Sequence, residues 1–222
     1  MKIVKPMARS ASPPIYQVKK IPDHQQLIDG KGTASLWTFA NLLTQFSYPW
    51  NDGLPPTTQF RALRDSTFLY FIYHAMDAGI SQKATLSRPV IDADRVEIFF
   101  KRNDDMNPYY SLEMDALGRV LSTKNRFYRN IDMNWKWPAG HFELMASMNE
   151  TGYVVEGKIS LDSLRQLNLL DGNIIKAGLF RGEYFYGKNG IEEVKWISWV
   201  KPDSTVPDFH IASAFGVLEL LD

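Results

Sequence analysis

Tryptophans with polar neighbours are the residues of this sequence best suited to bind a ligand. Trp135–Pro138 lies in a polar segment, and Trp196–Trp199 precedes a proline-bearing loop that ends at Pro207–His210. Loop aromatics of this kind can form platforms for the apolar face of a sugar ring, while polar side chains hydrogen-bond its hydroxyls. Trp196 and Trp199 have opposite phase in a strand, so ordinary packing of one in the core and one at the surface stays open.

Paired carboxylates are the second chemical possibility, because glycosidases use two of them across the scissile bond. Glu97 and Glu113 could be neighbours on adjacent strands, and Asp94 lies shortly before the first of them. Strand alternation alone places polar residues at such positions, so the pattern favours solvated side chains over catalysis. An O-glycosyl hydrolase that uses Glu97 and a second carboxylate remains an alternative function.

Haem ligation is a third possibility, with Met76, Met106 and His210 as candidate ligands. With eight Met and four His in the chain such pairs are unavoidable, and methionine is more often core filler. The sequence has no P-loop, no spaced-glycine dinucleotide motif, no zincin helix and no nucleophile-elbow serine. Nucleotide chemistry and hydrolytic triads are therefore not indicated, and a haem-binding redox module is a minor alternative.

Composition restricts the partners further. The 25 basic and 25 acidic residues cancel, so no nucleic acid is expected as a partner. No apolar run is long enough for a membrane span, and the absence of cysteine excludes disulfides and thiolate metal sites. No secretory leader is visible, which predicts either a cytoplasmic protein or a periplasmic or secreted one whose leader has been removed.

Short runs with period-two alternation must position these residues. Phe68–Met76 is almost continuously large and branched, as expected of a central strand. Arg95–Phe100 alternates, with Glu97 on the face opposite Val96 and Ile98. Further strands are expected at 109–115, 119–121, 142–146, 153–159, 174–183, 194–200 and 215–221.

The remaining elements are few. One helical segment is predicted after residue 159, with Ser160 or Asp162 as its N-cap and Asp171-Gly172 as its end. Residues 1–35 resemble an irregular lead-in with a possible edge strand at 15–18. The sequence thus predicts one all-β domain over residues 1–222, an antiparallel β-sandwich with one or two short helices.

Six segments occur in an order shared with one known family, over about residues 30–221: Phe68–Phe71 with Asp77, Asp94–Phe100, Tyr109–Glu113, Gly152–Glu156, Trp196–Trp199 and Phe215-Gly216. In these segments the chain resembles the carbohydrate-binding module family 9-like domains of polysaccharide-degrading bacteria, which also occur beside xylanases. The resemblance implies a jelly-roll-like sandwich and non-catalytic binding of xylan- or glucan-type oligosaccharides or chain ends. It also implies a terminal sugar held between two tryptophans, and structural calcium in some members.

The resemblance assigns roles to particular positions. Glu97 falls on the acidic residue that faces sugar hydroxyls, and Phe209 falls on one of the two stacking aromatics. The position of the other aromatic holds Ile91, and the arginine expected on the next strand is replaced by Glu113.

Additional ligand contacts are predicted from the residues themselves. Trp135, Trp137 or Tyr109 could supply the missing ring from another loop, and Trp199 belongs to the second tryptophan pair. Arg181 and His210 are expected to make polar contacts, because both lie beside the same edge of the expected sandwich.

Overall fold

The computed structural model describes residues 12–222 except 24, 26–27, 78 and 81–83. Its strands are β1 (Ile15–Lys20), β2 (Thr58–Arg64), β3 (Phe68–Met76), β4 (Arg95–Lys101), β5 (Tyr109–Asp115), β6 (Val120–Arg126), β7 (Asn130–Asp132), β8 (Phe142–Asn149), β9 (Gly152–Ser160), β10 (Leu170–Asp171), β11 (Ile174–Tyr186), β12 (Glu192–Ser198) and β13 (Gly216–Leu220). The helix α2 spans Leu161–Gln166, and short 3₁₀ turns occur at Ser35–Phe39, Val90–Asp92 and Ala212–Ala214.

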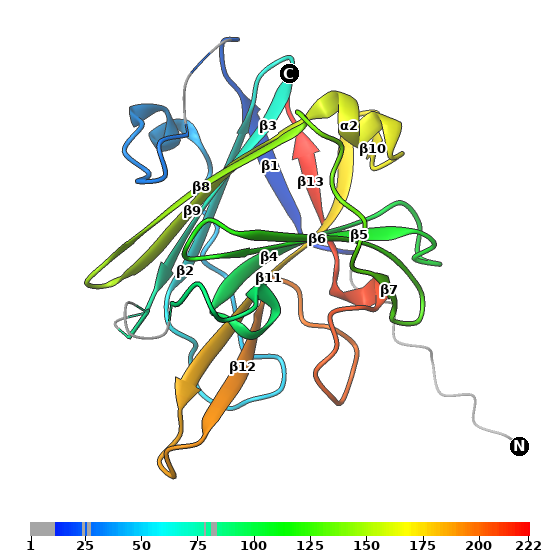
Figure 1. Cartoon of the computed structure of the whole chain (residues 1–222). Coiled ribbons are helices and arrows are strands. Elements are labelled where there is room, and N and C mark those ends of the chain that lie inside the picture. Colours follow the sequence, from blue (N-terminus) through cyan, green and yellow to red (C-terminus); the bar gives the residue numbers. More distant parts are fainter. Residues whose placement is uncertain (1–11, 24, 26–27, 78, 81–83) are drawn as a thin grey trace, which may run out of the picture.

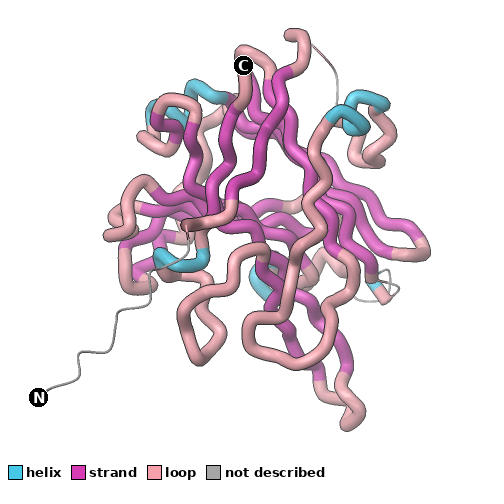
Figure 2. The backbone as a smooth tube through the Cα atoms, turned by 180° about the vertical axis from the view of Figure 1, so that it is seen from behind, coloured by secondary structure: helices cyan, strands magenta, loops and turns pink. Residues whose placement is uncertain are grey.

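The strands form one curled sheet in the order β7-β6-β5-β4-β11-β13-β1-β2-β3-β9-β8, with β10 and β12 paired to β11. The two halves of this path face each other as the layers of a sandwich, which confirms the predicted fold class (Figures 1 and 2). Strand β3 pairs with β2 on one side and β9 on the other, so it is internal, as its apolar sequence predicts.

Strand β1 joins the two layers. Its residues 15–18 pair with β13, and Lys19 and Lys20 pair with β2. Among the described residues, 15–18 have β13 as their only strand partner, so the predicted edge strand is present there. Both pairings of β1 are parallel, whereas the other strands pair antiparallel. The partner β13 lies about 200 residues away in sequence, and local composition carries no signal for a pairing at that separation.

The core lies between the two layers and takes one face of each strand. Val96, Ile98 and Phe100 of β4 point into it together with Leu112 of β5, as their alternation predicts. The helix α2 begins at Ser160, whose hydroxyl accepts a hydrogen bond from the Ser163 amide. The helix ends at Gln166 rather than near residue 171, because Asn168 takes a left-handed conformation (φ 56°) and residues 170–171 pair with β11.

In the described residues, no helix is long and apolar enough to cross a membrane.

Candidate functional site

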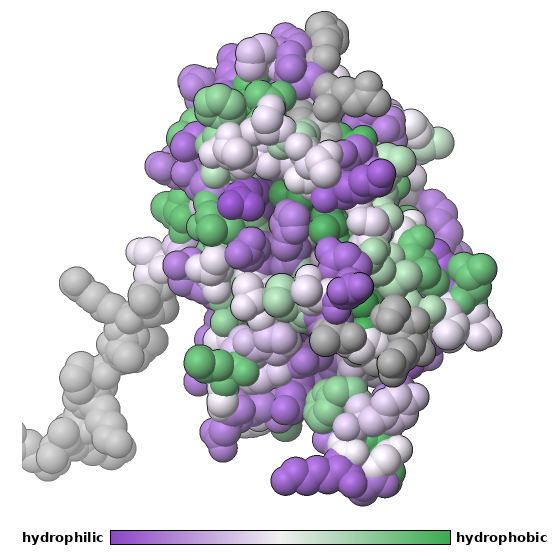
Figure 3. All heavy atoms as spheres, turned by 90° about the vertical axis from the view of Figure 1, so that its left-hand side faces the viewer, coloured by the Kyte–Doolittle hydropathy of each residue, from purple (hydrophilic) through white to green (hydrophobic). Residues whose placement is uncertain are grey.

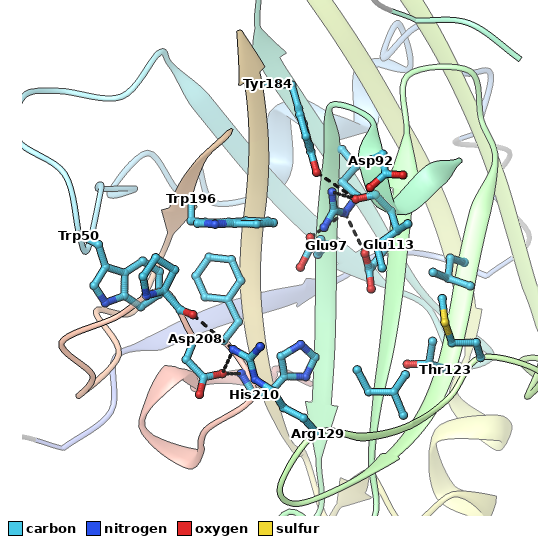
Figure 4. Close-up of a pocket in the computed structure, with 17 residues that line it drawn as sticks. Trp50, Asp92, Glu97, Glu113, Thr123, Arg129, Tyr184, Trp196, Asp208 and His210 are labelled. Carbon is cyan, nitrogen blue, oxygen red and sulfur yellow. Dashed lines mark hydrogen bonds and ion pairs between the residues drawn. The ribbon is translucent and has the colours of Figure 1, made fainter. Parts of the chain in front are cut away.

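A cavity of about 390 Å³ lies on the face of β4, β5, β6 and β12 that points away from the core (Figure 4). Its volume is within the range of roughly 300–1,000 Å³ that is usual for small-molecule sites. Strand alternation explains its position, because residues 95, 97 and 113 have the opposite phase to the core residues of the same strands. Tyr184 of β11 and four further segments contribute the rest of the lining: Trp50, Ile91 with Asp92, Arg129 with Ile131 and Met133 around β7, and Pro207 to His210.

The floor of the cavity is a buried ion-pair cluster. The Nε atom of Arg95 lies 2.8 Å from Glu97 Oε1 and 2.8 Å from Glu113 Oε2. All three residues are at most 7% exposed, because the surrounding segments of the cavity lining cover them. The prediction that these carboxylates are solvated is therefore wrong, since the sequence did not show which loops fold over this sheet face.

The cluster holds two carboxyl groups against one guanidinium. Burial raises the pKa of Glu97, Arg95 acts in the opposite direction, and the negative charge of Glu113 raises it further. Burial also raises the pKa of Glu113, opposed by Arg95. The cluster therefore retains a proton at pH values where an exposed pair would have lost both, and it offers both a hydrogen-bond donor and acceptors.

Arg95 is fixed from three directions. Its Nη1 donates to the carbonyl oxygens of Ile91 (2.7 Å) and Ala93 (3.3 Å). Its guanidinium lies 5.3 Å from the ring centroid of Trp196, within cation–π range. A Cβ atom at Gly182 of β11 would lie 3.2 Å from the Trp196 ring and 3.3 Å from Arg95 Nη1, so the glycine leaves room for this contact.

One wall of the cavity is aromatic. Phe209 stacks on Phe180 with ring centroids 4.0 Å apart and an interplanar angle of 12°. Trp50 and Trp196 flank Phe209 at 5.4 and 5.7 Å, the latter edge to face. The Trp50 indole donates to the carbonyl of Ser204 (2.9 Å), which ties this wall to the 202–207 loop. Trp196 and Phe209 therefore present apolar ring surface beside the polar floor (Figure 4).

The loop that carries Phe209 is held by Asp208. This carboxylate accepts from the Tyr128 hydroxyl (2.7 Å) and the His210 amide (2.9 Å), and it pairs with Arg129 (3.1 Å). The His210 Nδ1 atom lies 2.8 Å from the hydroxyl of Tyr109. Burial lowers the pKa of His210 to about 4, with a further contribution from Arg129 that Asp208 opposes. His210 is therefore neutral at neutral pH.

The opposite wall is aliphatic. Leu121 of β6 and Ile131 of β7 line the cavity on the other side of β5 and β4 from β12, the strand that carries Trp196. Met133 and Ile91 also line it. Ile91, Ile131 and Met133 are 40–45% exposed, so their apolar surface is available to a ligand. The cavity is thus a slot with rings on one side, alkyl groups on the other and charged groups below.

The structure brings four of the predicted site residues together at this cavity: Glu97, Glu113, Phe209 and His210. Tyr109 is fully buried behind His210. Arg181 is also fully buried and points between the sheets, where it donates to Thr58 Oγ1 (3.2 Å) and the Met76 carbonyl (2.9 Å).

The other predicted rings lie elsewhere. Trp137 and Trp199 belong to the main core, and Trp135 packs on Tyr110 at 5.0 Å. The pattern of one core and one outer ring in the pair 196/199 is confirmed, with Trp196 at the cavity. Sequence reasoning did not single out Arg95, although its spacing of two from Glu97 places both side chains on one face of the strand. It also missed Trp50, because no local pattern connects that residue to the site.

Within the residues that the structure describes, the acidic side chains give no support for a structural calcium. In the part of the chain that the structure describes, no group of three or more Asp, Glu or His side chains is close enough to hold a metal ion. The two adjacent carboxyl groups in the cavity, Glu97 and Glu113, already form ion pairs with Arg95.

The protein's stability is expected to respond to pH through Glu97. Its folded-state pKa lies above the ordinary value of 4.5, so its contribution is fully present below pH 4.5 and is lost as pH rises through the raised folded value. We expect the melting temperature of the wild type to fall more steeply above pH 5 than that of Glu97→Gln. Parallel thermal unfolding curves from pH 4.5 to 9 measure this, and identical slopes would contradict it.

The family model described as carbohydrate family 9 binding domain-like matches residues 28–222. Among solved structures, a proposed carbohydrate-binding protein from Bacteroides uniformis is similar in fold, with TM-score 0.69, 17% identity and coverage of 95% of this chain and 100% of that chain. A family 9 carbohydrate-binding module from Caldicellulosiruptor kristjanssonii in complex with glucose gives TM-score 0.61, 18% identity and coverage of 94% and 96%. A family 9 carbohydrate-binding module from the same organism in complex with cellotriose gives TM-score 0.62 and 16% identity, and the match covers 93% of this chain and 93% of that chain. No curated protein sequence matches the chain.

Proposed function

This chain belongs to the carbohydrate family 9 binding domain-like family, and we propose that it binds the end of a neutral glucan- or xylan-type saccharide without cleaving it. The observation that carries the proposal is the juxtaposition of the Phe209–Trp196 wall with the Arg95–Glu97–Glu113 floor in one cavity. Sugar rings have apolar C–H faces and hydroxyl edges, and this slot offers a partner to each. The glucose and cellotriose in the two Caldicellulosiruptor complexes support a glucan-type ligand.

The family resemblance implies a sugar held between two tryptophans, and this chain lacks one of the two stacking rings. Other residues of the cavity can take the place of that ring. The sugar face opposite Phe209 packs on the alkyl groups of Ile131, Met133 and Ile91 instead of a second ring. The resemblance predicts an arginine at position 113, where this chain has glutamate. Arg95 on the neighbouring strand supplies a positive charge instead, and it forms an ion pair with Glu113. The biological setting we propose for this binding is polysaccharide utilisation.

Trp196→Ala is expected to abolish saccharide binding, because it removes both a ring of the wall and the cation–π partner of Arg95. Titration with cello-, xylo- and manno-oligosaccharides, followed by calorimetry and tryptophan fluorescence, measures it. Tyr186→Ala is the matched control, since Tyr186 is 67% exposed on β11 and does not line the cavity.

Two results would contradict the proposal. The wild type could bind no member of a broad glycan panel, or Trp196→Ala could bind as tightly as the wild type. The same incubations are assayed for reducing-sugar release, which a protein that only binds does not produce.

A further inference from the structure

The charged groups of the cavity are already paired with one another. Arg95 is bound to Glu97 and Glu113, and Arg129 is bound to Asp208. Among the described residues that line the cavity, these two arginines face four carboxyl groups, Asp92 being the fourth, and no lysine is present.

Both arginines already have carboxylate partners. Arg95 lies below the floor at 4% exposure, and an incoming carboxylate would meet Glu97 and Glu113 as closely as it meets the guanidinium. The Arg129 side chain is 45% exposed, but its charge is balanced by Asp208, whose carboxylate also accepts from two further donors. His210 adds no positive charge, because burial lowers its pKa to about 4.

A buried anion without a cationic partner loses its hydration and gains little in return. Hydroxyl groups do not meet this penalty, because a protonated carboxyl and a carboxylate can donate to and accept from them. An ammonium group would meet an excess of carboxyl oxygens.

Resting on the saccharide-binding function above, we propose that this cavity selects its ligand by charge, accepting neutral and amino sugars and rejecting uronic acids. The selecting groups are the Arg95–Glu97–Glu113 cluster at the floor and Asp92 at the rim.

Three probes that differ at one substituent test the inference: glucose, glucuronate and glucosamine, each displacing cellotriose at pH 7 and 0.15 M salt. We expect glucuronate to bind about ten- to a hundredfold more weakly than glucose, the range that one unpaired buried polar group produces. Glucosamine is expected to bind at least as tightly as glucose.

Asp92→Asn supplies the decisive comparison, because it removes one negative charge from the rim of the cavity and keeps the shape of the side chain. We expect the ratio of glucose to glucuronate affinity to fall several-fold. Glu150→Gln removes the same charge from the exposed β8–β9 turn and should leave the ratio unchanged. Asp92 is exposed, so Asp92→Asn carries little risk to folding.

Glucuronate that binds as tightly as glucose would overturn the inference and leave saccharide binding intact. A ratio that is equal in the wild type and Asp92→Asn would also overturn it. Failure of all three probes and of cellotriose would overturn the proposed function and the inference together.

Discussion

Arg95→Met is expected to lower the free energy of unfolding by about 3–5 kcal/mol at neutral pH and to abolish saccharide binding. The substitution leaves Glu97 and Glu113 buried without their cation. Both carboxyl groups must then stay protonated or be exposed by movement of the loops. Either response removes the polar floor that the proposed ligand contacts.

The size of this effect should depend on pH in a defined direction. In acid both carboxyl groups are protonated in the folded and the unfolded protein, so the deficit of Arg95→Met relative to the wild type shrinks as pH falls. Denaturant unfolding at pH 4.5 and pH 8 measures the deficit at each pH. A deficit that is equal at both, or that grows in acid, would show that charge is not its cause.

Arg88→Met is the control for charge removal in general. Arg88 forms a bidentate pair with Glu192 at 2.7 Å, but that pair is partly exposed. Exposed pairs contribute about 0–1 kcal/mol, so this variant should remain close to wild-type stability. A loss as large as that of Arg95→Met would mean that burial does not distinguish the two arginines.

Phe209→Ala is expected to cost about 3–5 kcal/mol of stability and to weaken saccharide binding at least about tenfold. The ring is 6% exposed and contacts Phe180, Trp50 and Trp196. Its removal leaves a hole in the wall and frees the tryptophans from their fixed positions.

Phe209→Leu separates packing from ligand contact. Leucine restores most of the apolar volume, so it should cost less than about 1.5 kcal/mol. It has no flat ring, so binding should remain weak. Urea unfolding and calorimetric titration of the two variants measure this, and a Leu variant that binds like the wild type would show that the flat face of the ring is not needed.

Local pattern predicted the strands well because alternation and burial act within a few residues. The phases of β4 and β5 placed Glu97 and Glu113 on a common face, and the structure confirms their pairing across the strands. The order of six segments also identified the family, which the match over residues 28–222 confirms.

Local sequence patterns could not predict which loops and side chains surround the sheet face that carries Glu97 and Glu113. Glu97 was expected to be solvated, but the structure buries it at the cavity floor. Trp135, Trp137 and Trp199 were expected at a ligand site, but Trp137 and Trp199 are buried in the main core and Trp135 packs against it. Whether a ring lies at a cavity or in a core depends on which loop crosses it, and Trp50 and Phe209 meet across 159 residues of chain.

The sequence by itself determined the β class, the strand phases and the residue types of a saccharide site, because these depend on neighbours one to four positions away. Only the tertiary structure decided that Arg95 pairs with both carboxyl groups of the floor, that alkyl groups of β6 and β7 line the cavity on the side away from β12, and that β1 joins the layers. Those features arise from loops and strands far apart in the chain, which packing of the whole sandwich brings together.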